Sequence, residues 1–134
     1  MCRIDIESRK KIKTLMLINL SNHPYELWSV KQQEAAAIYG TCVDLPFPPV
    51  DPEGDETYID QLAESYVAKV LAIAKGKEET TVHLMGEMTL TVALVKKLQA
   101  AGIICIASTT QRIVYDGKTS KEEAFQFCRF RKYS

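Results

Sequence analysis

Three runs of apolar residues each stop at a cluster of small polar residues, and this pattern limits the possible folds more than any other feature. The runs cover about 14–20, 80–85 and 103–108. Short runs that are apolar at nearly every position are typical of central strands in a parallel sheet. Open sheets of this kind bind ligands at the carboxyl ends of their strands. The pattern therefore predicts where a site lies before it indicates a chemistry.

Helix-like segments separate these runs. Ser29 is a suitable N-cap, and Gln32 stands three residues later, as in a capping box. Gly40 provides the C-terminal stop of that helix, and four prolines within 46–52 require an extended loop further on. On apolar spacing and end signals, we expect helices at about 31–39, 55–76 and 89–101, and a short strand at 41–45.

The last part of the chain has a different pattern. Residues 112–115 and 124–130 alternate between apolar and polar side chains, with a turn beginning at Asp116-Gly117. This alternation predicts an antiparallel hairpin at the edge of the sheet. We expect Phe127 on one face of the second strand and Phe130 on the other, because side chains alternate along a strand.

Together these elements predict an α/β fold. It is a Rossmann-like three-layer sandwich with a mainly parallel sheet, in the order β-α-β-α-β-α-β, followed by a C-terminal antiparallel β-hairpin. We assign 14–134 to one domain, because a chain of 134 residues has no room for a second core. Residues 1–13 are expected to form an N-terminal arm.

The charge and hydropathy of the chain argue against nucleic-acid and membrane partners. Seventeen Lys and Arg residues balance seventeen Asp and Glu residues, so the formal net charge is zero. A neutral chain has no overall field that gathers nucleic acid, and we therefore expect no long DNA or RNA partner. The apolar runs are far shorter than the about 20 residues that cross a bilayer, and the first dozen residues do not resemble a signal peptide. We expect a cytoplasmic protein without membrane contact.

Several chemistries lack their sequence signature. The four cysteines contain no CxxC pair, so we expect reduced thiols that pack as small apolar side chains. Neither a GxGxxG fingerprint nor a Walker-type lysine is present, which disfavours nicotinamide binding and NTP hydrolysis. The two histidines do not have metal-ligand spacing, and we expect no metal and no cofactor. His83 lies inside an apolar run, which favours a hydrogen-bonded core histidine over a ligand.

Polar residues follow the first apolar run. Ser21 and Asn22 offer donors and acceptors suited to a phosphate, a ribose or a base edge. His23 stands beside them and can exchange a proton near neutral pH. A simple turn before Pro24 explains the same residues equally well.

The second cluster follows the run at 80–85. Gly86 allows a tight turn from strand to helix, where helical N–H groups face an anion or a ribose. Glu87 either holds a ribose hydroxyl, serves as a base, or stabilises the helix start through the helix dipole. Met88 and Thr89 complete this candidate ligand-binding segment.

The third cluster is Ser108, Thr109, Thr110, Gln111 and Arg112. Hydroxyl groups followed by a guanidinium suit a phosphodiester, because the hydroxyls donate hydrogen bonds and the guanidinium binds two oxygens. The alternative is a polar turn that enters the hairpin, with a solvated arginine.

With the three clusters in view, the chain resembles the small CRISPR-associated proteins of the CARF-like group. The resembling segments are 17–24, 85–89 and 107–112, and with the order of strands and helices they cover about 15–112. The resemblance implies a Rossmann-like domain that binds a cyclic oligoadenylate second messenger between the two subunits of a homodimer. Some members of the group cleave this ligand without a metal, as ring nucleases.

The resemblance also implies roles for particular residues. Arg112, Thr109 and Thr110 would stabilise phosphate, His23 would act as acid or base, and Glu87 would fix a ribose. The expected function is a metal-independent RNA phosphodiesterase that removes a signal in antiviral defence. Two alternatives stay open: a non-catalytic sponge or sensor for the cyclic nucleotide, and a Rossmann-like domain for a small metabolite or mononucleotide. The sequence does not decide the ring size of the ligand.

Overall fold

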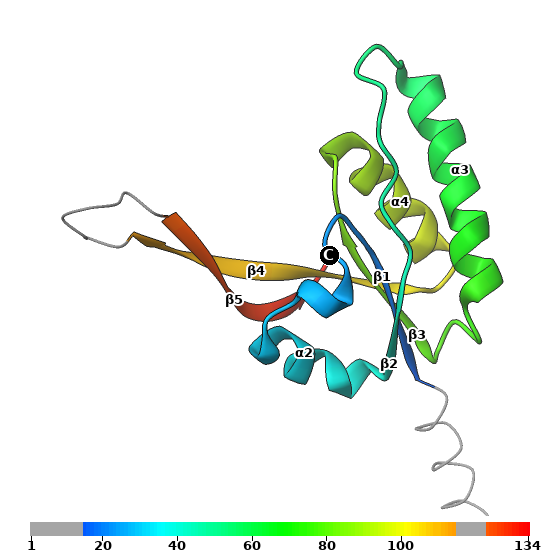
Figure 1. The fold of residues 1–134 in the computed structure, drawn as a ribbon. Coiled ribbons are helices and arrows are strands. Elements are labelled where there is room, and N and C mark those ends of the chain that lie inside the picture. Colours follow the sequence, from blue (N-terminus) through cyan, green and yellow to red (C-terminus); the bar gives the residue numbers. More distant parts are fainter. Residues whose placement is uncertain (1–14, 115–122) are drawn as a thin grey trace, which may run out of the picture.

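A computed structural model describes residues 15–114 and 123–134, and the predicted arm 1–13 and the turn at Asp116-Gly117 lie outside these ranges. Within them, five strands form one sheet in the order β2-β1-β3-β4-β5 (Figure 1). The strands are β1 (Met16–Ser21), β2 (Thr41–Asp44), β3 (Thr80–Met85), β4 (Ile104–Val114) and β5 (Glu123–Lys132). The helices are η1 (Tyr25–Leu27), α2 (Val30–Ala36), η2 (Ala37–Tyr39), α3 (Glu56–Ile73) and α4 (Met88–Ala100).

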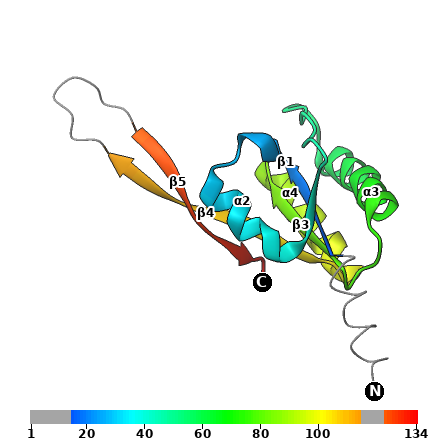
Figure 2. The same ribbon diagram turned by 60° about the horizontal axis from the view of Figure 1, so that its bottom comes forward.

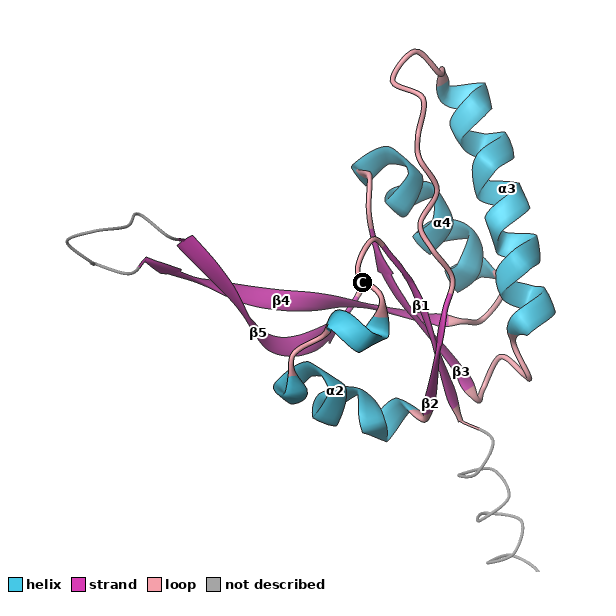
Figure 3. Cartoon of the chain, viewed as in Figure 1, coloured by secondary structure: helices cyan, strands magenta, loops and turns pink. Residues whose placement is uncertain are grey.

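The helices cover both faces of the sheet. α3 and α4 pack side by side on one face, and α2 lies on the other (Figure 3). Strands β1 to β4 run parallel, and β5 pairs antiparallel with β4. The predicted α/β sandwich with a C-terminal hairpin is therefore confirmed.

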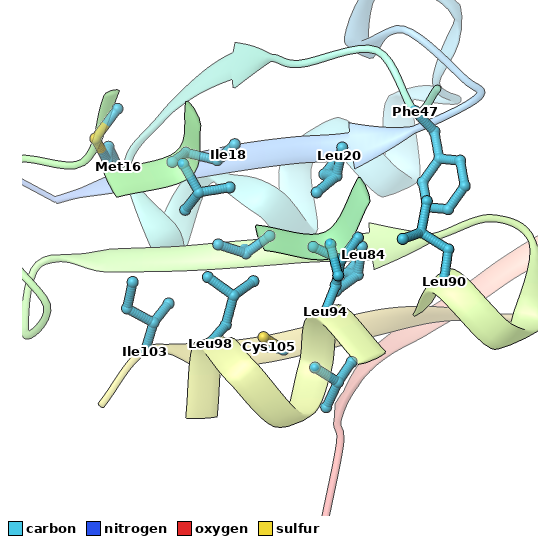
Figure 4. Close-up of a cluster of buried hydrophobic side chains, with 14 residues drawn as sticks. Met16, Ile18, Leu20, Phe47, Leu84, Leu90, Leu94, Leu98, Ile103 and Cys105 are labelled. Carbon is cyan, nitrogen blue, oxygen red and sulfur yellow. The ribbon is translucent and has the colours of Figure 1, made fainter. Parts of the chain in front are cut away.

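The larger core lies between the sheet and the α3/α4 layer. Ile18 and Leu84 reach into it from neighbouring strands, and Leu94 meets them from α4 (Figure 4). Because side chains alternate along a strand, the residues between them face α2 instead. Leu17 packs there with Trp28, whereas Asn19 brings a polar group to the same face.

The path of the chain places a crevice at the centre of the sheet. From β1 the chain crosses through α2 to β2 on one side, and later through α3 to β3 on the other side. The direction of winding thus reverses between β1 and β3, which are adjacent strands. Such a reversal opens a crevice at the carboxyl ends of the two strands, where α/β proteins bind ligands.

The fourth strand is longer than the sequence indicates. We expected a strand at 103–108 and a separate hairpin strand at 112–115, but β4 continues from Ile104 to Val114. It pairs with β3 at its start and with β5 from Ile106 onward. The polar segment 108–112 is therefore strand rather than turn, because pairing with β5 accommodates its threonines. Beyond the body, β4 and β5 form a two-stranded arm (Figures 1 and 2).

A β-bulge changes the faces of β5. Thr109 pairs with Arg129 and the next residue, Thr110, pairs with Phe127, so Cys128 is an extra residue in the second strand. An extra residue interrupts the alternation of side chains. Phe127 and Phe130 consequently share one buried cluster, with ring centroids 4.9 Å apart. The predicted placement of these two rings on opposite faces is wrong for this reason.

Helix ends follow the sequence signals with two exceptions, of which the first is that α3 ends at Ile73 and not at the expected Gly76. The Ser29 hydroxyl accepts a hydrogen bond from the Gln32 backbone N–H at 3.2 Å, and the helix region ends at Gly40, whose φ is 101°. Any other residue at that position would be strained, and its Cβ would lie 2.1 Å from the Leu15 carbonyl oxygen. The capping box is not completed, because the Gln32 side chain turns to Ser108 in the sheet.

Three cysteines fall within the described residues, and all are free thiols. Burial is the main reason that the pKa of Cys42 rises to about 11 and that of Cys105 to about 12. These two therefore behave as the small apolar residues that the sequence predicts. No helix in the ranges 15–114 and 123–134 has the length and apolarity needed to cross a membrane.

Candidate functional site

A pocket of about 920 Å³ opens at the carboxyl ends of β1 and β3 and along the middle of β4, on the face of the sheet that α2 covers. Its volume lies toward the upper end of the about 300–1,000 Å³ usual for small-molecule sites. All three polar clusters predicted from the sequence contribute to its wall. The residues of those clusters that line it are Ser21, Asn22, His23, Gly86, Ser108 and Thr110.

The segment after Gly86 does not line the pocket. Glu87 is the N-cap of α4, and its carboxylate accepts hydrogen bonds from the backbone N–H groups of Thr89 and Leu90. The Thr89 hydroxyl donates a further bond, which is the main reason that the pKa of Glu87 lies below its ordinary value. Met88 is the first residue of α4 and is exposed. The predicted role of Glu87 in holding a ribose stays a prediction.

Gly86 has a packing role. A Cβ at this position would lie 2.4 Å from ring carbons of Phe47, which packs in the larger core. The residue therefore leaves room for an aromatic ring. The expected tight turn from strand to helix is present, since only Gly86 and Glu87 separate β3 from α4, and the φ of Gly86 is not positive.

The third cluster divides along β4. Ser108 and Thr110 line the pocket, whereas Thr109, Gln111 and Arg112 do not. The Thr109 hydroxyl donates to the carbonyl oxygen of Arg129 on β5. Arg112 lies opposite Phe125 in the hairpin, and Phe125 does line the pocket. Residues directly opposite each other share a face of a sheet, so Arg112 lies on the same face as Phe125 but outside the pocket lining.

Behind His83, which lines the pocket, Asn19 is the centre of a hydrogen-bond network. Its side chain is 1 % exposed. The amide nitrogen donates to Asp44 Oδ1 and to the His23 carbonyl, both at 2.8 Å. Both partners are acceptors only, so the amide has one possible orientation. The amide oxygen therefore faces His83, which lies directly opposite on β3.

This orientation fixes the tautomer of His83. Asn19 Oδ1 lies 2.9 Å from His83 Nδ1, so Nδ1 carries the proton. His83 Nε2 is then an acceptor, and it lies 2.6 Å from the Ser108 hydroxyl. Ser108 therefore donates to His83, and its oxygen accepts a bond of 3.1 Å from the Gln32 side-chain amide.

The environment keeps the His83 ring neutral. The rings of Trp28 and Phe130 pack at its sides, with centroids 5.1 Å and 5.6 Å from that of the imidazole. Burial lowers the pKa of His83 from 6.5 to about 4, and the charge of nearby His23 adds to this effect. At neutral pH the ring is thus an uncharged base, and its Nε2 accepts the hydrogen bond of the Ser108 hydroxyl.

The loop after β1 is held by the same network. The His23 carbonyl accepts hydrogen bonds from Asn19 Nδ2 at 2.8 Å and from Trp28 Nε1 at 3.0 Å. These bonds fix the backbone of His23, whose side chain is exposed at the pocket wall. Two imidazoles therefore face one pocket, one buried and one exposed.

The pocket wall combines apolar and cationic groups. Phe125 on the arm is 66 % exposed and Leu27 on η1 is 72 % exposed. Lys31 on α2 lines the same space and carries a positive charge. Within the described ranges, no three His, Cys, Asp or Glu side chains are grouped to hold a metal ion.

Sequence reasoning missed Asn19, Gln32 and Asp44. Asn19 and His83 were available as a signal, because each is a polar residue at an alternate position of an otherwise apolar strand. Polar residues at such positions must meet partners inside the fold. Nothing in the sequence indicated that Gln32 contacts the pocket, because its expected place in a capping box already explained a glutamine at this position.

The fold and the pocket define the class: a Rossmann-like α/β domain with a pocket at the switch point of its sheet. A family model described as "Uncharacterized protein MJ1673 family" matches residues 15–131, and the chain belongs to this family. No curated protein and no solved structure matches the chain. The function is therefore argued from the geometry of the pocket.

Proposed function

We propose that this protein binds a cyclic oligoadenylate in the pocket at the ends of β1 and β3 and along β4, and cleaves it without a metal. The observation that carries the proposal is the meeting of hydroxyl, imidazole, ammonium and aromatic groups in one pocket of about 920 Å³. Each group matches one part of an adenylate: aromatic rings stack on bases, and cations and hydroxyl groups bind phosphates.

The distribution of the groups supports a ligand with several nucleotides. Phe125 offers a ring face at the arm, whereas Lys31 and His23 lie along the walls nearer the body. A local cationic wall also fits the zero net charge of the chain, because a small ring needs only a few compensating charges. In a metal-free cleavage, the ribose 2′-oxygen attacks the adjacent phosphorus, and the protein positions this attack and moves protons.

Incubation with labelled cyclic adenylates of several ring sizes, in the presence of EDTA, tests the proposal. We expect linear products that end in a 2′,3′-cyclic phosphate, because the attacking oxygen comes from the ligand itself. Chromatography of the products with and without EDTA measures the metal requirement.

Two other results have distinct meanings. Tight binding of an intact ring without products would contradict the nuclease and favour the sponge. Failure to bind any ring size would contradict the proposal as a whole and leave the small-metabolite or mononucleotide alternative.

We further propose that two subunits share one ring. Leu27, Val30 and Ile38 project from η1, α2 and η2, and each is more than 70 % exposed. All three belong to the stretch 27–38, and we take this stretch as the interaction surface because exposed apolar side chains gain from being covered. Leu27 also borders the pocket, so a symmetric dimer through this surface brings two pockets together.

Light scattering after gel filtration tests the dimer. We expect the wild-type protein to have the mass of two chains and Val30→Asp to have the mass of one, because a buried unpaired charge at an interface is unfavourable. Leu71→Asp is the matched control, since Leu71 is an exposed apolar residue of α3 on the other side of the sheet. A wild-type monomer would contradict the homodimer.

A further inference from the structure

The hydrogen-bond chain that begins at the pocket wall points to a proton relay. Ser108 donates to His83 at 2.6 Å, His83 donates to Asn19 at 2.9 Å, and Asn19 donates to Asp44 at 2.8 Å. Each residue fixes the orientation of the one before it. Serine, histidine and a third group that orients the histidine are the parts of an activated hydroxyl.

The parts come from separate segments, and the fold aligns them. Asn19 and His83 are opposite each other on β1 and β3, and His83 is opposite Ile106 on β4. Ser108 stands two residues beyond Ile106 and therefore shares its face. Three neighbouring strands thus deliver their polar side chains to one line across the sheet.

Burial changes along this line. Asn19 and His83 are 1 % and 2 % exposed, whereas Ser108 is only partly buried and lines the pocket. A buried polar layer that served packing alone would need no outlet. This line is open at both ends, because Asp44 on β2 is exposed and Ser108 presents to the pocket a hydroxyl that a ligand can touch.

We propose that Ser108 is a catalytic residue whose proton passes to His83, with Asn19 and Asp44 as positioning residues. This inference rests on the proposed function for the identity of the ligand but not for the reactivity of position 108. In cleavage, the ribose 2′-hydroxyl gives its proton to Ser108 Oγ as the Ser108 proton moves to His83 Nε2.

The rest of the step then balances. The 2′-oxygen forms a bond to phosphorus, the bond from phosphorus to the 5′-oxygen breaks, and the leaving oxygen takes a proton from His23. His83 has gained one proton and His23 has lost one, and solvent in the pocket restores both. The negative charge that develops on the phosphate favours the protonated form of His83.

A thiol at position 108 tests the relay without any nucleotide. In Ser108→Cys, Nε2 of the neutral His83 ring accepts the thiol proton as the sulfur attacks, so we expect iodoacetamide at pH 6 to alkylate position 108 about ten times faster than Cys128, or more. Cys128 is an exposed thiol in the same chain and serves as the internal reference. Mass spectrometry locates the label.

The second variant removes the base. Adding His83→Gln to Ser108→Cys should abolish the advantage of position 108 over Cys128. Equal alkylation of the two positions, or an advantage that survives the loss of His83, would overturn the relay. If the double variant does not fold, the comparison of position 108 with Cys128 in the single variant still decides.

Cleavage assays separate the relay from the ligand. If the wild-type protein cleaves a cyclic adenylate, Ser108→Ala should lower kcat by about 100-fold or more, with the Kd within about threefold of wild type. Thr81→Ala is the control, because Thr81 carries a hydroxyl on neighbouring β3 but does not line the pocket. Unchanged cleavage by Ser108→Ala would overturn the relay and leave the proposed function intact.

The relay and the proposed function can also fail separately in the other direction. Rapid alkylation at position 108 that depends on His83, together with no binding of any cyclic adenylate, would support the relay and contradict the proposed function.

Discussion

Replacing Asn19 by leucine is expected to lower the free energy of unfolding by about 3–4 kcal/mol, because it leaves His83 Nδ1 unpaired and removes a hydrogen-bond partner from further buried or partly buried polar groups. Leucine has nearly the same volume, so packing changes little. The groups that lose a partner are His83 Nδ1, the Ser21 hydroxyl and the His23 carbonyl. Urea denaturation followed by circular dichroism measures the change.

The matched control is Asn22→Leu. Asn22 is exposed three residues further along the same segment, and this substitution should change stability by less than about 0.5 kcal/mol. A similar small effect at Asn19 would contradict the central place of its amide in the network. Nuclear magnetic resonance adds a second readout: the ring nitrogens of His83 should show a single Nδ1–H tautomer in the wild type and a mixture in Asn19→Leu.

The second large effect concerns pH. The pKa of His83 is 6.5 in an ordinary environment and about 4 in the folded protein. Between these values the unfolded chain binds a proton that the folded chain does not, so stability falls as the pH falls from 6.5 toward 4. One proton contributes about 1.4 kcal/mol per pH unit, which gives a loss of about 3 kcal/mol over this window.

Carboxylates titrate in part of the same range, and a comparison of variants removes their contribution. The free energy of unfolding of His83→Gln should lack the component between pH 6.5 and 4, because glutamine does not titrate. His23→Gln should retain it, since the second histidine is exposed. An identical pH dependence in wild type and His83→Gln would show that His83 titrates in the fold as it does in the unfolded chain.

Much of the fold was predictable because its signals are local. The apolar run of β3 marks Thr80–Met85 at both ends, and Asp55 and Gly40 mark helix boundaries through their own capping and backbone chemistry. General rules on parallel strands then favour right-handed connections, whereas the strand order β2-β1-β3-β4-β5 had to come from the structure. The length of β4 was not predictable, because threonines at 109–110 form a strand only when β5 is present to pair with them.

The position of the pocket was predictable from the sequence, but the full set of residues that form it was not. Parallel strands end at one edge, which is why Ser21, His23 and Ser108 were expected together, and all three line the pocket. The partner of Gln32 could not be predicted, because its contact with Ser108 joins residues 76 positions apart. His83 was expected to be a hydrogen-bonded core residue, and that is confirmed. The sequence did not predict that His83 and Ser108 line the pocket together, because their contact joins two different strands.

The alternation of side chains along the central strands has a practical consequence for engineering this domain. Thr80 and Thr91 lie on the side of α3 and α4, and their buried hydroxyl groups have no hydrogen-bond partner. Substitutions at these two positions act on a layer that the sheet separates from the pocket. Apolar substitutions in this layer can therefore raise the stability of the domain without changing the residues that line the pocket.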